Sequence, residues 1–479
     1  MNSLFIMIFF LFLTGCLSGA IDDDELAIVF KDVSVIDANN GLRAGKSVIV
    51  SGNRIVEVGQ VEEITIPSDA IVVDCRGKYL IPGLWDAHVH LTNRDIHKPT
   101  IFPLFIVNGI TYLRDTSATL DLILPLREKA EETSRSYGLA PQIFITGPHI
   151  DGLQTSWASS VSAVSAEHAR TIVDSLLNAG VDEFKIYELL PPEIYFEVLS
   201  MAKSKNYKVS AHVPLGMDVI EASNAGLGSI EHLNNLELSF SSDFDSLLQE
   251  RRQMITDGSD KTGRELRGDI HRAQRQHALN SQDEERRKIV LETLADNNTM
   301  QVPTLAITAS AEHRLFAREE WRKTFRFLPE NTRTEWNERA DKWVNQSPSD
   351  VEIAHANWAY DVIPDLVETG IGIMAGTDTP LSLLTPAFSL HEELALLVQA
   401  GLTPIQALEA ATLRPAQYFG LENQQGSIAK GMRADLVILD ANPLEDITNT
   451  QRIWTVMRDG HLHTRDELDK IIAQLENPQ

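Results

Sequence analysis

Two histidines, two residues apart, carry the clearest chemical signal in the sequence. His88 and His90 close the apolar run 84–91, which follows the turn Pro82-Gly83. Side chains alternate across a strand, so both imidazoles point the same way. Neutral imidazole is a preferred zinc ligand, and the pair would supply half of a metal site. Two half-buried strand histidines would give the same pattern.

Further candidate ligands end apolar or β-branched segments downstream. They are Lys185 in 182–187, His212 in 207–213, His232 in 228–233 and Asp378 in 371–378. A chance arrangement would scatter such residues among helices and surface loops. Their common place at strand ends favours one shared site.

The elements that would position these residues alternate between strands and amphipathic helices, the helices including 165–179, 192–204 and 217–225. Eight strand-helix units close a (β/α)8 TIM barrel, in which catalytic groups lie at the carboxyl ends of the strands. The sequence therefore predicts an α/β fold. We expect the eight strands at 84–91, 110–116, 142–147, 183–187, 208–213, 229–233, 301–307 and 371–378.

With these residues in place, the chain resembles the amidohydrolase superfamily of metal-dependent hydrolases. The flanking segments 108–115 and 426–437 are similar to segments of that superfamily. The Phe184-Lys185-Ile186-Tyr187 context resembles its imidazolonepropionase-like and Xaa-Pro dipeptidase-like branches. The resemblance implies a barrel whose metal ligands are His88, His90, Lys185, His212, His232 and Asp378.

Lys185 is a poor ligand as an ammonium group, which has no lone pair. The resemblance implies that it is carboxylated to N6-carboxylysine, an anion that bridges two divalent metal ions, which we expect to be zinc. The alternative is an ordinary ion pair with Asp182 or Glu183. An unmodified Lys185 would reduce the site to one metal ion.

Two metal ions sharing a water would supply hydroxide near neutral pH, and one of them would polarise the scissile carbonyl. Asp378, the expected catalytic residue, would accept the proton of the water and pass it to the leaving group. Tyr187 is a candidate substrate contact. We find no Gly-x-Ser-x-Gly nucleophile elbow and no phosphate-binding loop in the sequence.

A second, smaller domain is expected from the two ends of the chain. Segments 27–81 and 426–463 contain strand patterns, and the resemblance implies that they form the two parts of a β-sandwich beside the barrel domain 82–425. We expect 464–479 to be a C-terminal helix or tail. Cys75 reads as a small buried hydrophobe, because no partner thiol would remain in the mature chain.

The N-terminus predicts a location outside the cytoplasm. Residues 4–13 are apolar but too short to span a bilayer, and residues 1–15 read as a signal peptide. Cys16 follows Leu13-Thr14-Gly15 as in bacterial lipoproteins, although no Lys or Arg precedes the apolar run. We expect a lipidated Cys16, a linker over 16–26, and an envelope enzyme facing the periplasm or the exterior. An ordinary secretory signal and an uncleaved anchor are the alternatives.

The net charge of -26 argues against a nucleic-acid partner. Two long charged insertions, 243–297 and 311–351, would form a lid over the metals, a contact between subunits of a homo-oligomer, or solvated decoration.

Three classes of function remain. The first is hydrolysis of a C–N amide bond in a dipeptide, Xaa-Pro-like, or in an N-acyl amino acid. The second is hydrolysis of a lactone, ester or phosphotriester on the same site, or of a cyclic amide, as in imidazolonepropionase, with one metal ion. The third is a surface-anchored binding protein without turnover, which the presence of Asp378 disfavours because binding needs no proton shuttle.

Overall fold

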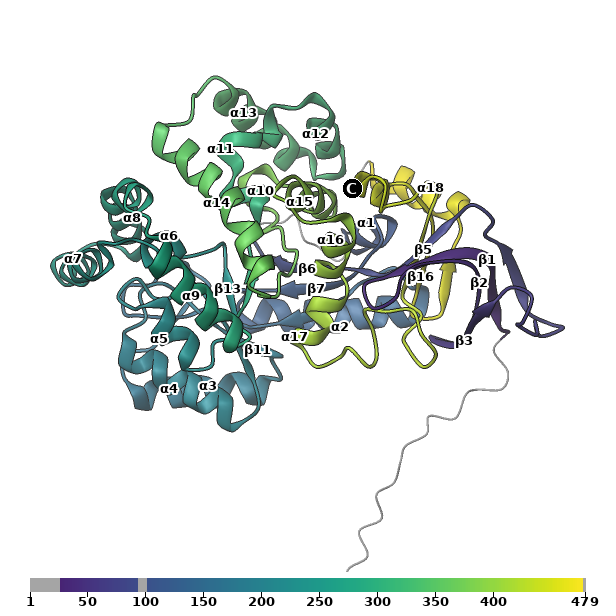
Figure 1. Ribbon diagram of the computed structural model, residues 1–479, viewed down its shortest axis with the longest axis horizontal. Helices are drawn as coiled ribbons and strands as arrows, with labels where there is room; N and C mark the ends of the chain where they lie inside the picture. The colour runs from purple at the N-terminus through teal and green to yellow at the C-terminus, as the bar shows by residue number, and fades with distance from the viewer. Residues whose placement is uncertain (1–25, 94–100, 477–479) are drawn as a thin grey trace, which may run out of the picture.

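The two ends of the chain meet in one β-sheet, drawn in purple and yellow at the right of Figure 1. The computed structural model describes residues 26–93 and 101–476. The strand order is β17-β16-β15-β5-β1-β2-β3, with β4 paired to β1. The strands are β1 (Ile28–Asp37), β2 (Gly41–Ser51), β3 (Arg54–Gln60), β4 (Ile71–Asp74), β5 (Tyr79–Pro82), β15 (Leu436–Leu439), β16 (Ile453–Arg458) and β17 (His461–His463).

Hydrogen bonding makes this terminal domain one continuous eight-stranded sheet, whereas we expected the two sheets of a sandwich. The junction between the chain ends is the antiparallel pair β5–β15, in which Leu80 lies opposite Ile438. Both residues belong to an apolar core that also contains Phe30 and Cys75. Burial raises the pKa of the Cys75 thiol to about 12, which agrees with its expected role as a small hydrophobe.

Parallel strands alternate with helices through the middle of the chain, which confirms the α/β class. The strands are β6 (Leu84–Val89), β7 (Ile110–Asp115), β8 (Gln142–Ile145), β9 (Ile150–Asp151), β10 (Val161–Ser162), β11 (Glu183–Ile186), β12 (Lys208–Ala211), β13 (Ser229–Glu231) and β14 (Met300–Val302). The helices between them include α1 (Phe102–Val107), α2 (Leu120–Tyr137), α3 (Ala166–Ala179), α4 (Pro192–Ser204), α5 (Val219–Asn224) and α6 (Leu236–Ser239).

Local sequence explains several of these boundaries. Ser165 accepts a hydrogen bond from the His168 amide at the start of α3, and Gly180 ends the helix in the left-handed region. Pro192 begins α4, where its fixed φ is favourable and no amide hydrogen is needed. Every residue of β6 is buried, as expected for a strand with both faces covered.

Two of the eight expected strands differ from the sequence prediction. In the segment 301–307, β14 ends at Val302 and the short helix α10 (Leu305–Thr308) follows, because Thr304 adopts a φ of 47°. Residues 371–378 form no regular strand in the described chain. Isolated parallel bridges occur instead, one joining Gln301 to Ile373 within this segment and one joining Val89 to Thr379 directly after it.

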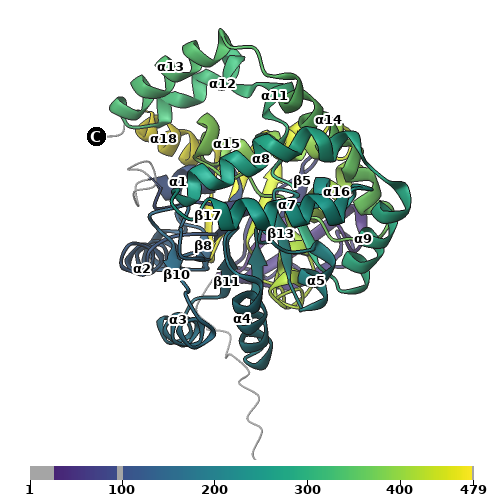
Figure 2. The same ribbon diagram turned by 90° about the vertical axis from the view of Figure 1, so that its left-hand side faces the viewer.

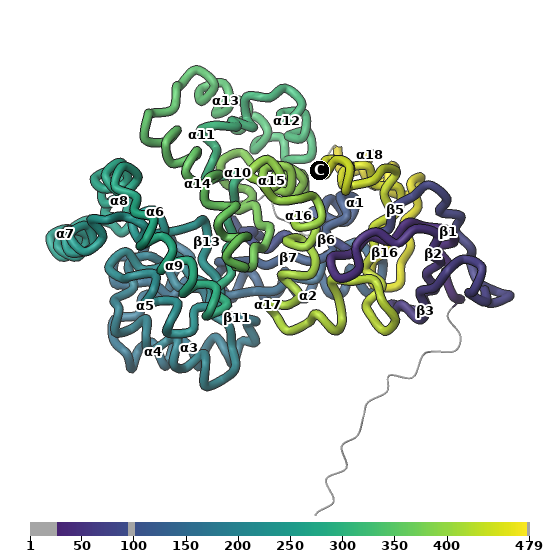
Figure 3. The backbone as a smooth tube through the Cα atoms, viewed as in Figure 1, coloured from purple at the N-terminus to yellow at the C-terminus, as the bar shows by residue number. Residues whose placement is uncertain are grey.

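The two charged insertions fold mostly into helices. Figure 2 looks onto α7 and α8, which lie in front of β11 and β13, and Figure 3 shows α12 and α13 in a separate lobe. No helix of the described residues is long and apolar enough to cross a membrane. The first insertion contains α7 (Phe244–Asp257), α8 (Gly263–Asn280) and α9 (Glu284–Asp296), and the second contains α11 (Ser310–His313), η3 (Leu315–Ala317), α12 (Glu319–Lys323), η4 (Thr324–Phe327) and α13 (Glu330–Val344).

The remaining helices complete the chain after the second insertion. They are α14 (Asp350–Glu368), η5 (Leu381–Leu383), α15 (Phe388–Gln399), α16 (Pro404–Ala410), α17 (Leu413–Tyr418), η6 (Ile447–Gln451) and α18 (Arg465–Leu475). Of the two expected alternatives for residues 464–479, helix or tail, the structure shows a helix over Arg465–Leu475. The expected signal peptide and Cys16 lie outside the described residues.

Candidate active site

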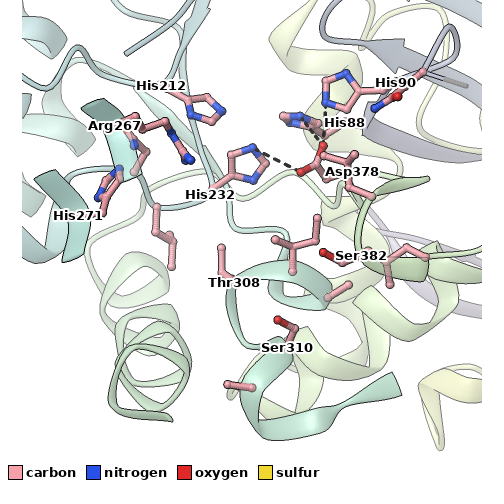
Figure 4. Close-up of a pocket in the computed structure, with 18 of the residues that line it drawn as sticks. His88, His90, His212, His232, Arg267, His271, Thr308, Ser310, Asp378 and Ser382 are labelled. Atoms are coloured by element: carbon pink, nitrogen blue, oxygen red, sulfur yellow. Dashed lines mark ion pairs between the residues drawn. The ribbon is translucent and has the colours of Figure 1, made fainter. Parts of the chain in front are cut away.

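The structure gathers histidines from three strand ends around Asp378 (Figure 4). His90 Nε2 lies 2.8 Å and His88 Nε2 lies 3.4 Å from Asp378 Oδ1. His232 Nε2 lies 3.9 Å from Asp378 Oδ2, and the His232 ring packs 4.6 Å from the ring of His212. Ligand atoms of His88, His232 and Asp378 all fall within 4.8 Å of one another.

Three of these histidines have the same tautomer, because a neighbour fixes the proton on Nδ1. His88 Nδ1 lies 2.6 Å from Glu231 Oε2, and His212 Nδ1 lies 2.8 Å from Glu188 Oε1. A carboxylate can only accept, so both imidazoles donate from Nδ1.

A hydroxyl group, and not a carboxylate, fixes the proton of His232 on Nδ1. Its Nδ1 lies 2.6 Å from Thr304 Oγ1, which itself donates to the carbonyl of Pro303. The hydroxyl proton is therefore already used, and His232 must donate. Burial lowers the pKa of His232 well below its usual range, so its Nε2 carries a free lone pair beside Asp378.

Lys185 is fully buried at the end of β11, and its Nζ has no hydrogen-bond partner among the described residues. Its Nζ forms an ion pair with Glu231, whose Oε1 lies 3.8 Å away. The expected alternative was an ion pair with Asp182 or Glu183. Burial lowers the pKa of Lys185 to about 8, although the Glu231 carboxylate acts in the opposite direction. A buried amine with this pKa is neutral far more often than an exposed lysine.

Segment 371–378 is fixed against β6 by backbone and side-chain hydrogen bonds. The Asp378 amide donates to the carbonyl of His88 at 2.7 Å, and Asp86 accepts from the amide and hydroxyl of Thr377. A Cβ added at Gly376 would lie 2.7 Å from His88 Cβ, so only glycine permits this approach. These contacts hold Asp378 over the histidine pair, with Asp378 itself at a φ of 62°.

A cavity of about 1100 Å³ opens over this cluster. Both insertions contribute to its wall, through α8 on one side and the region between α10 and α14 on the other. Tyr187, the expected substrate contact, lines the cavity, with its ring 4.4 Å from that of His212. Both insertions therefore border the cavity over the histidines.

Several residues of the site were missed by sequence reasoning. His149 lines the cavity after β8, with its ring 6.4 Å from that of His90, and the strand-end rule would have found it. Glu188 and Glu231 carry no such signal, because each is one acidic residue among many. Only the fold shows that Glu188 accepts from His212 and Glu231 from His88.

The donor set fits a metal ion. Nε2 of His232 and the oxygens of Asp378 are all acceptors, and His232 Nε2 lies 3.9 Å from Asp378 Oδ2. Acceptors this close repel one another unless a cation lies between them. Imidazole nitrogens oriented by carboxylates, together with one carboxylate oxygen, are the ligands that zinc prefers.

Part of the chain is similar to a known family of proteins. Residues 276–462 match the Amidohydrolase family. Adenine deaminase 3 of Rhizobium meliloti (strain 1021) is 53% identical over 51 residues, which are 10% of this chain and 9% of that protein. Imidazolonepropionase of Vibrio cholerae serotype O1 (strain ATCC 39541 / Classical Ogawa 395 / O395) is 30% identical over 134 residues, 27% of this chain and 30% of that protein. The chain thus spans less than a third of the length of these curated relatives.

Solved structures share the fold over nearly the whole chain. Bottromycin amidohydrolase aligns with a TM-score of 0.71 and 21% identity, covering 95% of this chain and 91% of that one. A Xaa-Pro dipeptidase with bound methionine aligns with a TM-score of 0.62 and 20% identity, covering 91% and 100%. These matches show that the chain shares its fold with these two proteins.

Proposed function

We propose that this chain is a metal-dependent hydrolase of C–N amide bonds, with Xaa-Pro-like dipeptides or N-acyl amino acids as substrates. The observation that carries the proposal is the Nδ1 hydrogen bond that His88, His212 and His232 each make, with Nε2 of His88 3.4 Å and Nε2 of His232 3.9 Å from the Asp378 carboxylate. The matched family and the dipeptidase and amidohydrolase folds support the same reaction class.

The six expected ligands would hold two divalent ions, which we propose to be zinc: His88, His90, Lys185, His212, His232 and Asp378. Such ions, when bound, polarise the scissile carbonyl and lower the pKa of a water. Glu231 and Glu188 keep the His88 and His212 imidazoles in the ligating tautomer. Thr304 does the same for His232.

Asp378 moves the proton in this reaction. The water oxygen forms a bond to the carbonyl carbon and gives its proton to the Asp378 carboxylate. The C–N bond then breaks, and Asp378 returns the proton to the leaving nitrogen. Asp378 enters this reaction as the carboxylate and therefore acts first as a base.

Lys185 would enter the site as N6-carboxylysine. Its neutral amine forms an N–C bond to carbon dioxide and loses one proton, which leaves an anionic carbamate with two oxygens. The buried Nζ without a hydrogen-bond partner supports this modification, since an unmodified ammonium there would have unsatisfied donors.

The experiment is a comparison of native, chelated and zinc-restored protein on dipeptides, N-acyl amino acids, lactones and phosphotriesters. We expect amide hydrolysis that disappears with the metal and returns with it. His88→Ala should lose metal and turnover together, whereas His168→Ala, on the exposed face of α3, should lose neither. Turnover of only esters or phosphotriesters, or amide hydrolysis by metal-free protein, would contradict the proposal.

We also infer that the parallel strands close into a (β/α)8 barrel with segment 371–378 as the eighth member. Two links support closure. The Asp182 amide donates to the Ile145 carbonyl between β8 and β11, and the Ala87 amide donates to the Ala375 carbonyl beside β6.

We propose an envelope location with lipid attached to Cys16. The apolar run 4–13 followed by Leu13-Thr14-Gly15-Cys16 supports it. Labelling cells with a radioactive fatty acid tests the proposal, because the wild-type protein should take up label and Cys16→Ser should not. An unlabelled wild-type protein would refute lipidation.

A further inference from the structure

We propose that Arg267 binds the α-carboxylate of the substrate and so restricts the enzyme to amides whose nitrogen belongs to an amino acid. The inference rests on the proposed function and narrows its substrate class. Arg267 comes from α8, in the first insertion, and lines the cavity above the histidines. Figure 4 draws it beside His212, on the side of the cavity opposite His90.

One edge of the Arg267 guanidinium forms an ion pair with the protein, without a hydrogen bond from Nε in the described chain. Its Nε lies 2.8 Å from Glu188 Oε2, and the other oxygen of Glu188 accepts from His212. Glu188 is fully buried, so this contact fixes the arginine relative to the metal-ligand histidine. Across residues 26–93 and 101–476, the terminal nitrogens Nη1 and Nη2 of Arg267 make no hydrogen bond to the protein. A guanidinium whose Nε faces Glu188 in an ion pair leaves its two terminal NH2 groups as parallel donors, the geometry that binds a carboxylate in bidentate fashion.

The position of Arg267 specifies an α-carboxylate rather than a distant anion. The Glu188 carboxylate contacts both its guanidinium and the His212 ring. In an N-acyl amino acid or a dipeptide, the carboxylate is two bonds from the amide nitrogen. A substrate whose amide lies beside His212 therefore brings this carboxylate, and not a more remote one, to Arg267.

Other arginines of the cavity are already engaged. Arg275 contacts His271 and Glu237, and Arg314 donates to three backbone carbonyls at the end of α13 and just beyond it. Arg272, on the same helix as Arg267, is 73% exposed and pairs with Asp269. Substitution of Arg272 is therefore a matched control, because it removes the same side chain from the same helix and changes the net charge by the same amount.

The wall opposite α8 suits the acyl part of such a substrate. Ile307, Phe316 and Trp343 line it, and all three are half-buried. Phe316 and Trp343 pack edge to face, with ring centroids 5.4 Å apart. An apolar acyl group or N-terminal side chain would cover these surfaces while the carboxylate stays at Arg267.

The test compares a panel of N-acetyl-L-amino acids with the decarboxylated N-acetylamines that match them. For wild type we expect a preference for the carboxylated member of each pair. Arg267→Gln should reduce kcat/KM for the carboxylated substrates by about 10- to 100-fold, the range for a lost charged hydrogen bond. The decarboxylated substrates should be affected far less. Arg272→Gln should behave as wild type, and Arg267→Lys, which keeps the charge but not the paired donors, should be intermediate.

A calorimetric measurement separates this inference from the proposed function. N-acetyl-L-amino acids should bind wild type and Arg272→Gln more tightly than they bind Arg267→Gln, whether or not any amide is hydrolysed. Weakened binding to Arg267→Gln without turnover in wild type would refute the hydrolase and leave the carboxylate site standing. An Arg267→Gln protein that melts like wild type and keeps the full preference for carboxylated substrates would overturn the inference.

Discussion

Replacing Glu231 by glutamine should change the tautomer of the proposed metal ligand His88 while leaving His88 itself in place. Glu231 is fully buried, and its two oxygens serve different partners. Oε1 accepts from Ser229 and Arg114, and Oε2 accepts from His88. A glutamine of the same shape keeps only one accepting oxygen, which the two donors on the Oε1 side would hold.

The glutamine NH2 would then face His88 Nδ1. Two donors cannot share a hydrogen bond, so His88 must move its proton to Nε2, the atom that faces Asp378. A protonated Nε2 cannot bind a metal ion. The loss of such an orienting partner weakens metal binding by about 10- to 100-fold, and we expect this effect in Glu231→Gln.

The same substitution should also destabilise the metal-free protein. Removing one partner of a buried ion pair costs about 3–5 kcal/mol. Arg114 keeps its contact with Glu183 at 3.0 Å, so we expect the lower end, about 3 kcal/mol of unfolding free energy. This loss of unfolding free energy does not involve a metal ion. Urea unfolding of metal-free protein should therefore measure it without a contribution from metal binding.

The assay is a zinc titration against a competing chelator, with Glu197→Gln as the control. Glu197 pairs with Arg170 at the surface, where the same change should alter neither metal affinity nor stability measurably. A Glu231→Gln protein with wild-type zinc affinity would refute the reasoning, since His88 would then need no fixed tautomer.

Three further predictions concern the metal site itself. Protein purified without chelator should carry two divalent ions, zinc by our prediction, and elemental analysis that finds no metal in active protein would exclude the mechanism. Lys185→Ala should abolish turnover, and small carboxylic acids should restore part of it by replacing the lost anion between two cations. Near-normal turnover with two metals in that variant would exclude the bridging role. Asp378→Asn should keep the fold and at least one metal while turnover falls on the order of 100-fold or more. A lower melting temperature with preserved turnover would instead make Asp378 a structural residue.

The six expected ligand positions could be named from the sequence because their signal is local. A histidine, lysine or aspartate at the end of an apolar run marks the carboxyl end of a buried strand, and such ends meet on one face of a parallel sheet. The structure does bring His88, His90 and His232 around Asp378. Their roles as ligands, and the carboxylation of Lys185, stay predictions.

The prediction of strands from apolar runs was less reliable where contacts with distant parts of the chain decide the backbone conformation. Residues 371–378 look like a strand by composition, yet Gly376 packs against His88 and the segment makes only isolated bridges. In 301–307 the strand stops early, because Thr304 turns the chain and Glu393 accepts from the first amides of α10. Glu393 is far away in sequence, so no local pattern could reveal this contact.

The sequence by itself determined the α/β class, the residue types available for metal binding, and the acidic charge that disfavours nucleic acid. These properties follow from local periodicity and composition. Tertiary structure alone decided which carboxylate orients which histidine, and which arginine of α8 keeps two donors free above them. Those choices depend on contacts such as Glu231 with His88 and Arg267 with Glu188, between residues 79 or more positions apart, which packing brings together and sequence spacing does not encode.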